Sequence, residues 1–188
     1  MNTQTNNERV TQLITDCLAN KRKAQHQFFK LFYSRAMSVC MRYAKDEDEA
    51  ADMLNEGFMK VFSNLAKYTE TEKGSFDAWF KKVMIHTAID YQRRYKKLTQ
   101  TVDYEDIPAV EIQLTNENEA IAKLSADELI RHIQLLPPTT RQVFNLYVFE
   151  DLPHAEIAKL LDMKEGTSQW HLNQARTKLK EIITKNDQ

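Results

Sequence analysis

The sequence predicts an all-helical protein with two small domains joined by a flexible acidic linker. Glycine and proline are scarce, with 3 Gly and 4 Pro in 188 residues, whereas β-sandwiches and barrels need many turns built from these residues. Hydrophobic residues form 42% of the chain, which is enough to bury a core and argues against general disorder. Their spacing of three and four residues is typical of helices with one buried face.

Charge divides the sequence into three parts. Basic and acidic residues number 17 and 12 in residues 1–98, 1 and 8 in residues 99–128, and 8 and 7 in residues 129–188. The formal net charge of the whole chain is −1, so the chain lacks the strongly basic balance that alone marks a nucleic-acid binder. The two changes of sign indicate separate segments with different partners.

Four helices are expected in the first domain. Apolar residues recur every three or four positions over Val10–Tyr43, with a break near residues 20–23, which predicts two helices. The acidic run at residues 46–49 provides the first turn of a third helix. Residues 68–75 are expected to form a loop, after which the spacing predicts a fourth helix over residues 76–97.

The second domain follows a segment in which the apolar periodicity fades. Pro108 and several acidic residues lie between residues 99 and 118, so this segment is predicted to be a linker between domains at residues 1–98 and 119–188. Pro137 and Pro138 interrupt the second domain. Its predicted helices cover residues 119–136, 139–149, 153–161 and 165–183.

Residues 153–172 carry the most specific pattern, that of a helix-turn-helix. Ala158 provides the small residue that two closely crossing helices need, with apolar residues around it. Asp162 stands at the turn, where Asp tolerates left-handed geometry better than most residues do. The alternative is an ordinary helical hairpin. The second helix would present to a DNA groove or its phosphates Thr167, Ser168, Gln169, Trp170, His171, Asn173, Gln174 and Arg176.

Basic residues interleave with aromatic ones along the fourth helix, a mixture suited to phosphate contact and base stacking. A solvated helix with aromatic core residues would show the same pattern, so both interpretations stay open. His86 and Asp90 are four residues apart, but no third and fourth ligand follow, and no metal site is expected. The interleaved basic and aromatic residues of the fourth helix are Trp79, Lys81, Lys82, His86, Tyr91, Arg93, Arg94, Tyr95, Lys96 and Lys97.

Glu49, Asp52 and Glu56 form an acidic stripe on the third helix, because they are three and four residues apart. Such a stripe is either plain exposed surface or a docking face for a basic partner. Paired carboxylates also serve hydrolases, but no metalloprotease helix motif, phosphate-binding loop or nucleophile elbow accompanies them. An enzyme is therefore not expected, and neither is a cofactor.

Cys17 and Cys40 lie within apolar helical patterns without further ligands nearby, and they are expected to pack as small hydrophobic residues. No signal peptide and no apolar run of about 18 residues is found. The sequence therefore predicts a cytoplasmic protein.

Taken in order, several segments resemble the bacterial sigma-70 family, in particular its extracytoplasmic-function (ECF) type, which keeps only regions two and four. Asp48–Phe62 resembles the family's polymerase-binding helix, and Phe76–Arg94 resembles its minus-ten recognition helix. The segments that resemble region four are Leu135-Leu136-Pro137, Arg141–Phe144, Glu156-Ile157-Ala158, Gly166-Thr167 and Ala175-Arg176.

This resemblance implies that the chain binds core RNA polymerase, directs it to promoter DNA and assists strand opening. Region two would occupy residues 1–98 and region four residues 119–188. Glu49, Asp52, Asn55 and Glu56 would dock on polymerase. The minus-ten contacts would come from Trp79, Lys82, His86, Arg93, Arg94 and Lys97, and the minus-thirty-five contacts from the eight helix-turn-helix residues given above.

The resemblance also implies a regulatory partner, because the family is commonly held inactive by an anti-sigma factor that is often anchored in the membrane. The chain itself is not expected to insert into a membrane. The main alternative is a helix-turn-helix regulator that binds duplex DNA without polymerase. A metal-dependent hydrolase is the third class, which the missing motifs disfavour.

Overall fold

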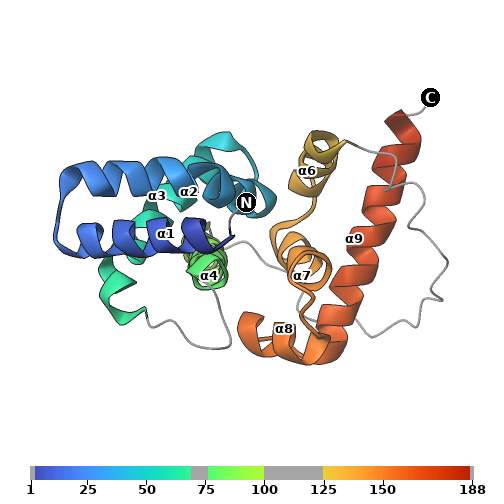
Figure 1. Cartoon of the computed structure of the whole chain (residues 1–188). Coiled ribbons are helices and arrows are strands. Elements are labelled where there is room, and N and C mark those ends of the chain that lie inside the picture. The colour runs from blue at the N-terminus through green and yellow to red at the C-terminus, as the bar shows by residue number, and fades with distance from the viewer. Residues whose placement is uncertain (1–2, 69–75, 100–124, 187–188) are drawn as a thin grey trace. The chain divides into compact units, whose positions relative to one another are not determined.

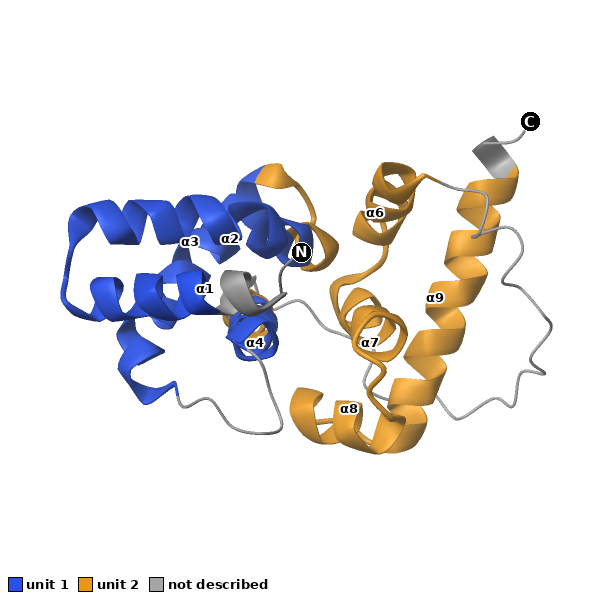
Figure 2. Cartoon of the chain, viewed as in Figure 1, with its two compact units in different colours: residues 1–40, 48–88 blue, residues 41–47, 89–188 orange. Residues whose placement is uncertain are grey.

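The computed structural model describes residues 3–68, 76–99 and 125–186, and every helix or strand element assigned in these ranges is a helix (Figure 1). The chain divides into two compact units, residues 1–40 with 48–88 and residues 41–47 with 89–188 (Figure 2). The all-helical prediction is confirmed over the described residues. The helices are α1 (Thr3–Leu18), α2 (Arg22–Tyr43), α3 (Glu47–Asn64), the 3-10 turn η1 (Leu65–Lys67), α4 (Phe76–Thr99), α6 (Ala126–Gln134), α7 (Pro138–Val148), α8 (His154–Leu161) and α9 (Glu165–Asn186).

Aromatic rings from α2, α3 and α4 form the core of the first unit. The ring centroids of Phe28 and Phe32 are 4.7 Å apart, those of Phe32 and Phe80 4.8 Å, and those of Phe58 and Phe80 5.7 Å. These distances are typical of favourable tilted and edge-to-face ring pairs. The four rings are at most 3% exposed, so they fix the three helices that carry the polar surface of this unit.

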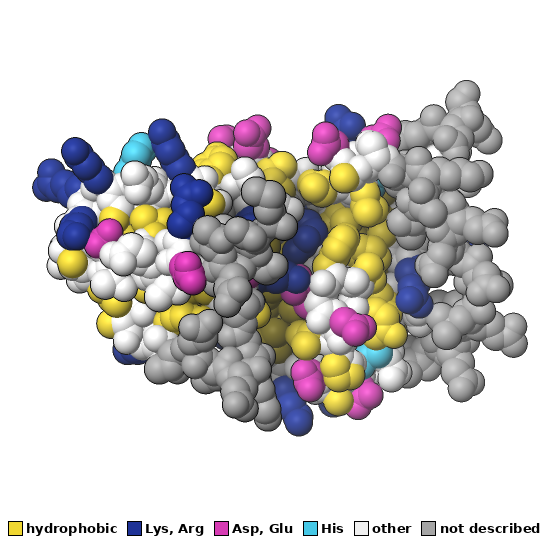
Figure 3. Space-filling view, viewed as in Figure 1, with side chains coloured by type: hydrophobic (Ala, Val, Ile, Leu, Met, Phe, Trp, Pro, Cys, Tyr) yellow, Lys and Arg dark blue, Asp and Glu magenta, His cyan; other side chains and the backbone are white. Residues whose placement is uncertain are grey.

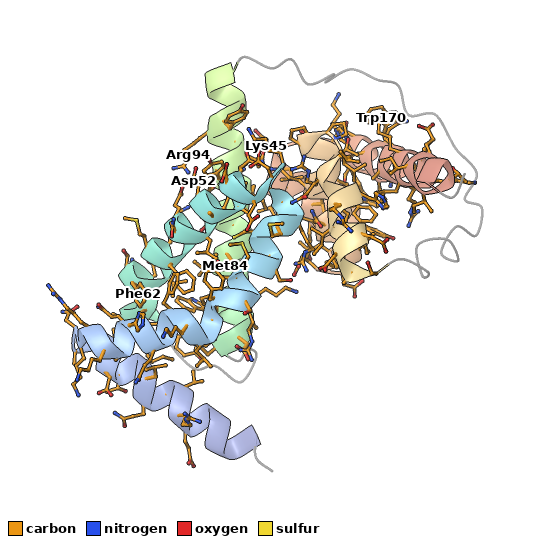
Figure 4. The ribbon with its side chains drawn as sticks, turned by 90° about the horizontal axis from the view of Figure 1, so that it is seen from above. Lys45, Asp52, Phe62, Met84, Arg94 and Trp170 are labelled. Atoms are coloured by element: carbon orange, nitrogen blue, oxygen red, sulfur yellow. The ribbon has the colours of Figure 1, made fainter. Side chains whose placement is uncertain are left out.

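Gly57 brings α3 and α4 close together. A Cβ atom at this position would overlap the Sδ and Cε atoms of Met84, whose side chain is fully buried. Figure 4 shows Met84 of α4 pointing into the space between helices, and it also labels Phe62 of α3. The lack of a Cβ atom at Gly57 therefore allows this close approach of the two helices.

Both cysteines are buried, as predicted for small hydrophobic residues. Cys17 lies on α1 and is 4% exposed, and Cys40 lies on α2 and is fully buried. Burial raises the pKa of the Cys17 thiol, with a smaller contribution from the Asp16 carboxylate. Both thiols therefore contribute packing rather than reactivity.

In the second unit, α7 lies at the centre of the helices formed by residues 126–186. Residues 140–146 are all buried, and α7 packs on α9, as does α8. The side chain of Arg141 donates to the carbonyl oxygens of Gln134 and Leu136, at 2.8 and 2.9 Å. It thereby satisfies backbone acceptors left free where α6 ends. Pro138 opens α7, where a proline costs no helical hydrogen bond.

Of the helix predicted over residues 119–136, the structure describes α6, which begins at Ala126 and ends at Gln134. Ser125 caps α6, because its hydroxyl accepts from the Glu128 backbone N–H while the Glu128 carboxylate accepts from the Ser125 backbone. These hydrogen bonds lower the pKa of the Glu128 carboxyl. Residues 119–124 and the predicted linker from residue 100 lie outside the described residues.

The helices of the part that the structure describes are all too short or too polar to cross a membrane.

Candidate functional site

The helix-turn-helix predicted around Ala158 is formed by α8 and α9. Asp162 ends α8 with a left-handed φ of 56°, and the Met163 backbone N–H donates to the Ala158 carbonyl oxygen at 3.0 Å. Ile157 and Leu172 are at most 3% exposed and pack on the inner side of the two helices. The predicted tolerance of the turn for Asp162 is confirmed by this left-handed geometry.

Two hydrogen bonds tie α9 to the elements behind it. His154 Nδ1 lies 2.9 Å from Ser168 Oγ, and His171 Nδ1 lies 3.0 Å from Thr140 Oγ1. The His154 ring also stacks on Tyr147, with 4.7 Å between ring centroids. Burial lowers the pKa of His154, because the neutral imidazole is favoured away from water.

The structure corrects the expected orientation of two helix-turn-helix residues. Ser168 is fully buried and His171 is 7% exposed, so neither side chain faces outward. The reason is helical phase: both lie on the side of α9 that carries the buried Leu172, Ala175 and Leu179. The six remaining residues of the predicted set are at least partly exposed, namely Thr167, Gln169, Trp170, Asn173, Gln174 and Arg176.

Aromatic groups support this outer face of α9. The Trp170 and His171 rings meet edge to face with 4.9 Å between centroids. The Arg176 guanidinium lies 5.9 Å from the centroid of the Tyr147 ring, within cation–π range. Figure 4 shows Trp170 projecting from the helix. The outer face therefore combines amide groups, one cation and one large ring.

A second surface follows α4. Lys82, His86, Arg93 and Arg94 are exposed and Trp79 is partly exposed. Positions 79, 82, 86 and 93 are separated by steps of three, four and seven residues, which places them on one face of the helix. The side chain of Lys97 lies outside the described side chains. The Arg93 guanidinium lies 3.8 Å from the Asp90 carboxylate, a distance at which an exposed pair adds little stability.

An aromatic ledge borders the start of α4 and was not predicted. The Tyr68 and Trp79 rings lie 5.4 Å apart, and Phe76 lies 5.4 Å from Trp79. Tyr68 and Trp79 are both partly exposed. Sequence reasoning missed Tyr68 because it is the first residue of the predicted loop, eleven positions from Trp79, and no helical spacing connects the two.

The acidic stripe on α3 differs from the predicted one at its first residue. Asp52 and Asn55 are exposed, and Glu56 is partly exposed and pairs with Lys60 at 3.3 Å. Glu49 is only 6% exposed, which contradicts its placement on an exposed stripe. It lies four residues before the fully buried Met53 and therefore on the inner side of the helix.

Met59 is the functional candidate that sequence reasoning missed on α3. Its side chain is 71% exposed, and it lies seven, four and three residues after Asp52, Asn55 and Glu56, which places the four residues on one face. The same i, i+3, i+4 spacing that revealed the acidic residues would have revealed Met59. The face therefore has a large apolar group beside its acidic and amide groups, and Figure 4 shows where Asp52 lies along α3.

The comparisons with known proteins match both units. The family model of Sigma-70 region 2 matches residues 28–98, and that of Sigma-70 region 4 matches residues 126–179. The chain belongs to the sigma-70 family. Region 2 thus contains α3 and α4, and region 4 contains the helix-turn-helix. A match to both regions favours a sigma factor over a helix-turn-helix regulator that acts without polymerase.

Relatives among known proteins are RNA polymerase sigma factors, several of which are named as ECF type. The chain is 26% identical over 180 residues to RNA polymerase sigma factor SigV of Bacillus subtilis (strain 168), covering 93% of each chain. It is also 26% identical over 153 residues to ECF RNA polymerase sigma factor SigE of Mycolicibacterium smegmatis, covering 80% of this chain and 58% of that relative. The chain is an ECF-type sigma factor.

A solved structure shares the fold. It is the sigma factor RpoE in complex with the anti-sigma factor NepR from Bartonella quintana, with a TM-score of 0.50 and 17% sequence identity, covering 87% of this chain and 98% of that chain.

Among the residues that the structure describes, no group of three or more His, Cys, Asp or Glu side chains is placed to hold a metal ion.

Proposed function

We propose that this sigma factor docks on core RNA polymerase through α3, reads the minus-thirty-five element with α9 and holds the opened minus-ten strand on α4. The observation that carries the proposal is the outer face of α9, which a helix-turn-helix presents away from its buried side. The two family models, which match residues 28–98 and 126–179, support the placement of both DNA-binding surfaces on one chain.

At the minus-thirty-five element, side-chain amides do the reading. Gln169 is exposed, and Asn173 lies four residues later on the same face of α9. Amide side chains pair bidentately with adenine in the major groove, and each good pair discriminates by about 1–3 kcal/mol. Arg176 contributes phosphate attraction from the same helix, which positions α9 without selecting sequence.

At the minus-ten element, α4 combines cations with rings. Lys82 and Arg94 attract the backbone, and Trp79 with Tyr68 offers ring faces to an unstacked base. Stacking of a base on an aromatic side chain contributes about 1–3 kcal/mol, which offsets the few kcal/mol that unstacking costs. Strand opening therefore requires no nucleotide hydrolysis by this chain.

Docking on polymerase uses the face of Asp52, Asn55, Glu56 and Met59. An exposed methionine surrounded by polar groups has the arrangement of a binding centre with a polar rim. The carboxylates suit a basic partner surface and select against acidic ones. An anti-sigma factor that regulates this chain would compete with polymerase for the α3 face. Because the chain acts on RNA polymerase, we infer that it acts in the cytoplasm.

Run-off transcription with core polymerase tests the function, and charge reversal on α3 tests the docking face. Asp52→Lys should weaken binding to core polymerase without loss of helical content, because its side chain is exposed. Glu181→Lys on α9 is the matched control, since it makes the same charge change at an exposed position that is not part of the α3 face. Equal affinities for Asp52→Lys, Glu181→Lys and the unsubstituted chain would reject the docking assignment.

A further inference from the structure

The first half of α2 carries exposed positive charge that none of the surfaces above uses. Arg22, Lys23, His26 and Lys30 are all exposed, and we call them the α2 basic face. The 22 residues of α2 include no Asp or Glu. Figure 3 shows Lys and Arg side chains gathered, with a His beside them, at the end of the first unit where α1 turns into α2.

These four residues lie together and away from the core. Arg22 and His26 are four residues apart, as are His26 and Lys30, and Lys23 precedes His26 by three. The buried side of the same helix is formed by Ala24, Phe28, Phe32 and Ala36, each at most 5% exposed. Among the described side chains, no ion pair involves Arg22, Lys23 or Lys30.

Helix stability does not account for the charges. Arg22 and Lys23 stand in the first turn of α2, where the helix dipole favours acidic groups and disfavours cations by about 0.3–1 kcal/mol each. One neighbouring cation is neutralised locally, because Lys21 pairs with Asp16 at 2.8 Å. The other charges oppose folding slightly, so a binding role explains them better than a structural one.

We propose that the α2 basic face binds phosphates of promoter DNA outside the two recognised elements. This inference rests on the proposed function and adds to it a further DNA contact. Phosphate binding requires charge alone and no fixed side-chain pattern, which fits three long cations and an imidazole without a carboxylate. Protein docking depends more on apolar groups, which this chain presents at Met59 on α3.

The salt dependence of promoter binding tests the proposal with the full chain and core polymerase. Lys23→Gln combined with Lys30→Gln removes two phosphate contacts, so the slope of log K against log salt should fall by about 1.4 to 1.8, which is 0.7 or 0.9 per contact. The affinity advantage of the unsubstituted chain then shrinks about 7- to 12-fold as salt rises fourfold. The matched control, Lys23→Arg with Lys30→Arg, should keep the original slope.

Folding does not confound this test. Replacing Lys23 in the first turn removes an unfavourable dipole interaction, so the Gln variant should unfold at the same temperature as the unsubstituted chain or higher. The loss of affinity should be equal on promoters with altered minus-ten or minus-thirty-five sequences, because phosphate contacts carry no sequence information.

Three outcomes overturn the inference or its basis. An unchanged salt slope in the Gln variant rejects phosphate binding at α2. A loss of affinity for core polymerase without DNA, with the slope unchanged, shows that the face docks protein, and the exposed Leu31 beside Lys30 would then contribute. Absence of promoter-specific binding by the unsubstituted chain with core polymerase rejects the proposed function itself, and the substitutions play no part in that result.

Discussion

Replacement of His171 by Ala should destabilise region 4 rather than change promoter preference. The His171 ring is 7% exposed and its Nδ1 lies 3.0 Å from the Thr140 hydroxyl, which is itself 4% exposed. Thr140 is on α7 and His171 is on α9, so the bond joins the two helices that form the centre of region 4. Its loss leaves a buried hydroxyl without this partner.

The size of the effect follows from that geometry. A buried polar group deprived of its partner costs about 1–3 kcal/mol, and removal of a packed ring adds a cavity term. We therefore expect His171→Ala to lower the free energy of unfolding by at least about 2 kcal/mol. For a domain of this size each kcal/mol corresponds to about 4–8 °C in Tm, so the melting temperature should fall by at least about 8 °C.

Tryptophan fluorescence measures this unit separately. The chain has 2 Trp, and Trp79→Phe leaves Trp170 on α9 to report region 4. Gln169→Ala is the control on the same helix, because Gln169 is exposed and its loss should reduce minus-thirty-five discrimination with little change in Tm. Adding Thr140→Val to His171→Ala should cost less than Thr140→Val alone. Unchanged Tm together with altered promoter discrimination in His171→Ala would refute the reasoning.

Three further predictions concern pH, packing and backbone geometry. Burial lowers the pKa of His154 below its ordinary 6.5, so the unfolded chain takes up a proton first and stability should fall as pH drops below that value; His154→Gln should flatten the Tm profile between about pH 7.5 and 5.5, and a profile that keeps its slope would contradict this. Gly57→Ala should lower the denaturation midpoint, because overpacking against buried Met84 by about 1–3 kcal/mol exceeds the gain of about 1 kcal/mol in helix propensity; a raised midpoint would show that Met84 yields freely. Asp162→Gly should leave Tm unchanged or higher while Asp162→Ala lowers stability by about 1 kcal/mol, since φ is 56°; equal melting of the two variants would remove the strain argument.

The helices could be predicted from the sequence because their buried positions recur at helical spacing. Phe28, Phe32 and Ala36 on α2 advance by four residues and are all buried. Such spacing is a local property and needs no knowledge of the partner helix. Ser125 was overlooked as a cap, although Glu128 follows three residues later and completes the pattern of a capping box.

The orientation of individual side chains was predicted less well, because it depends on contacts made far along the chain. Ser168 and His171 stand beside exposed residues of α9, and their hydrogen bonds to His154 and Thr140 hold them inward. His171 and Thr140 are 31 residues apart in sequence, and no local pattern connects them. The polar residue types of α9 pointed to DNA binding, whereas the position of each residue around the helix decides whether its side chain is exposed.

Glu49 illustrates the same limit on α3. Three acidic residues spaced by three and four suggested one exposed stripe. Glu49, however, is buried one helical turn before Met53, whereas Asp52 is exposed. Steps of three and four residues also connect a buried position of a helix with an exposed position beside it. The spacing of the acidic residues therefore did not show which of them are exposed. Had the apolar positions Ala50, Met53 and Leu54 fixed the phase first, Glu49 would have been placed on the inner side.

Mapping of RNA 5′ ends tests the central claim most directly. Core polymerase with this chain is given a library of genomic fragments, and the 5′ ends of the transcripts are sequenced beside those made by core polymerase alone. Discrete start sites should appear only with the chain, each preceded by two shared sequence elements, the minus-ten and the minus-thirty-five element. The same scattered starts with and without the chain would contradict the account.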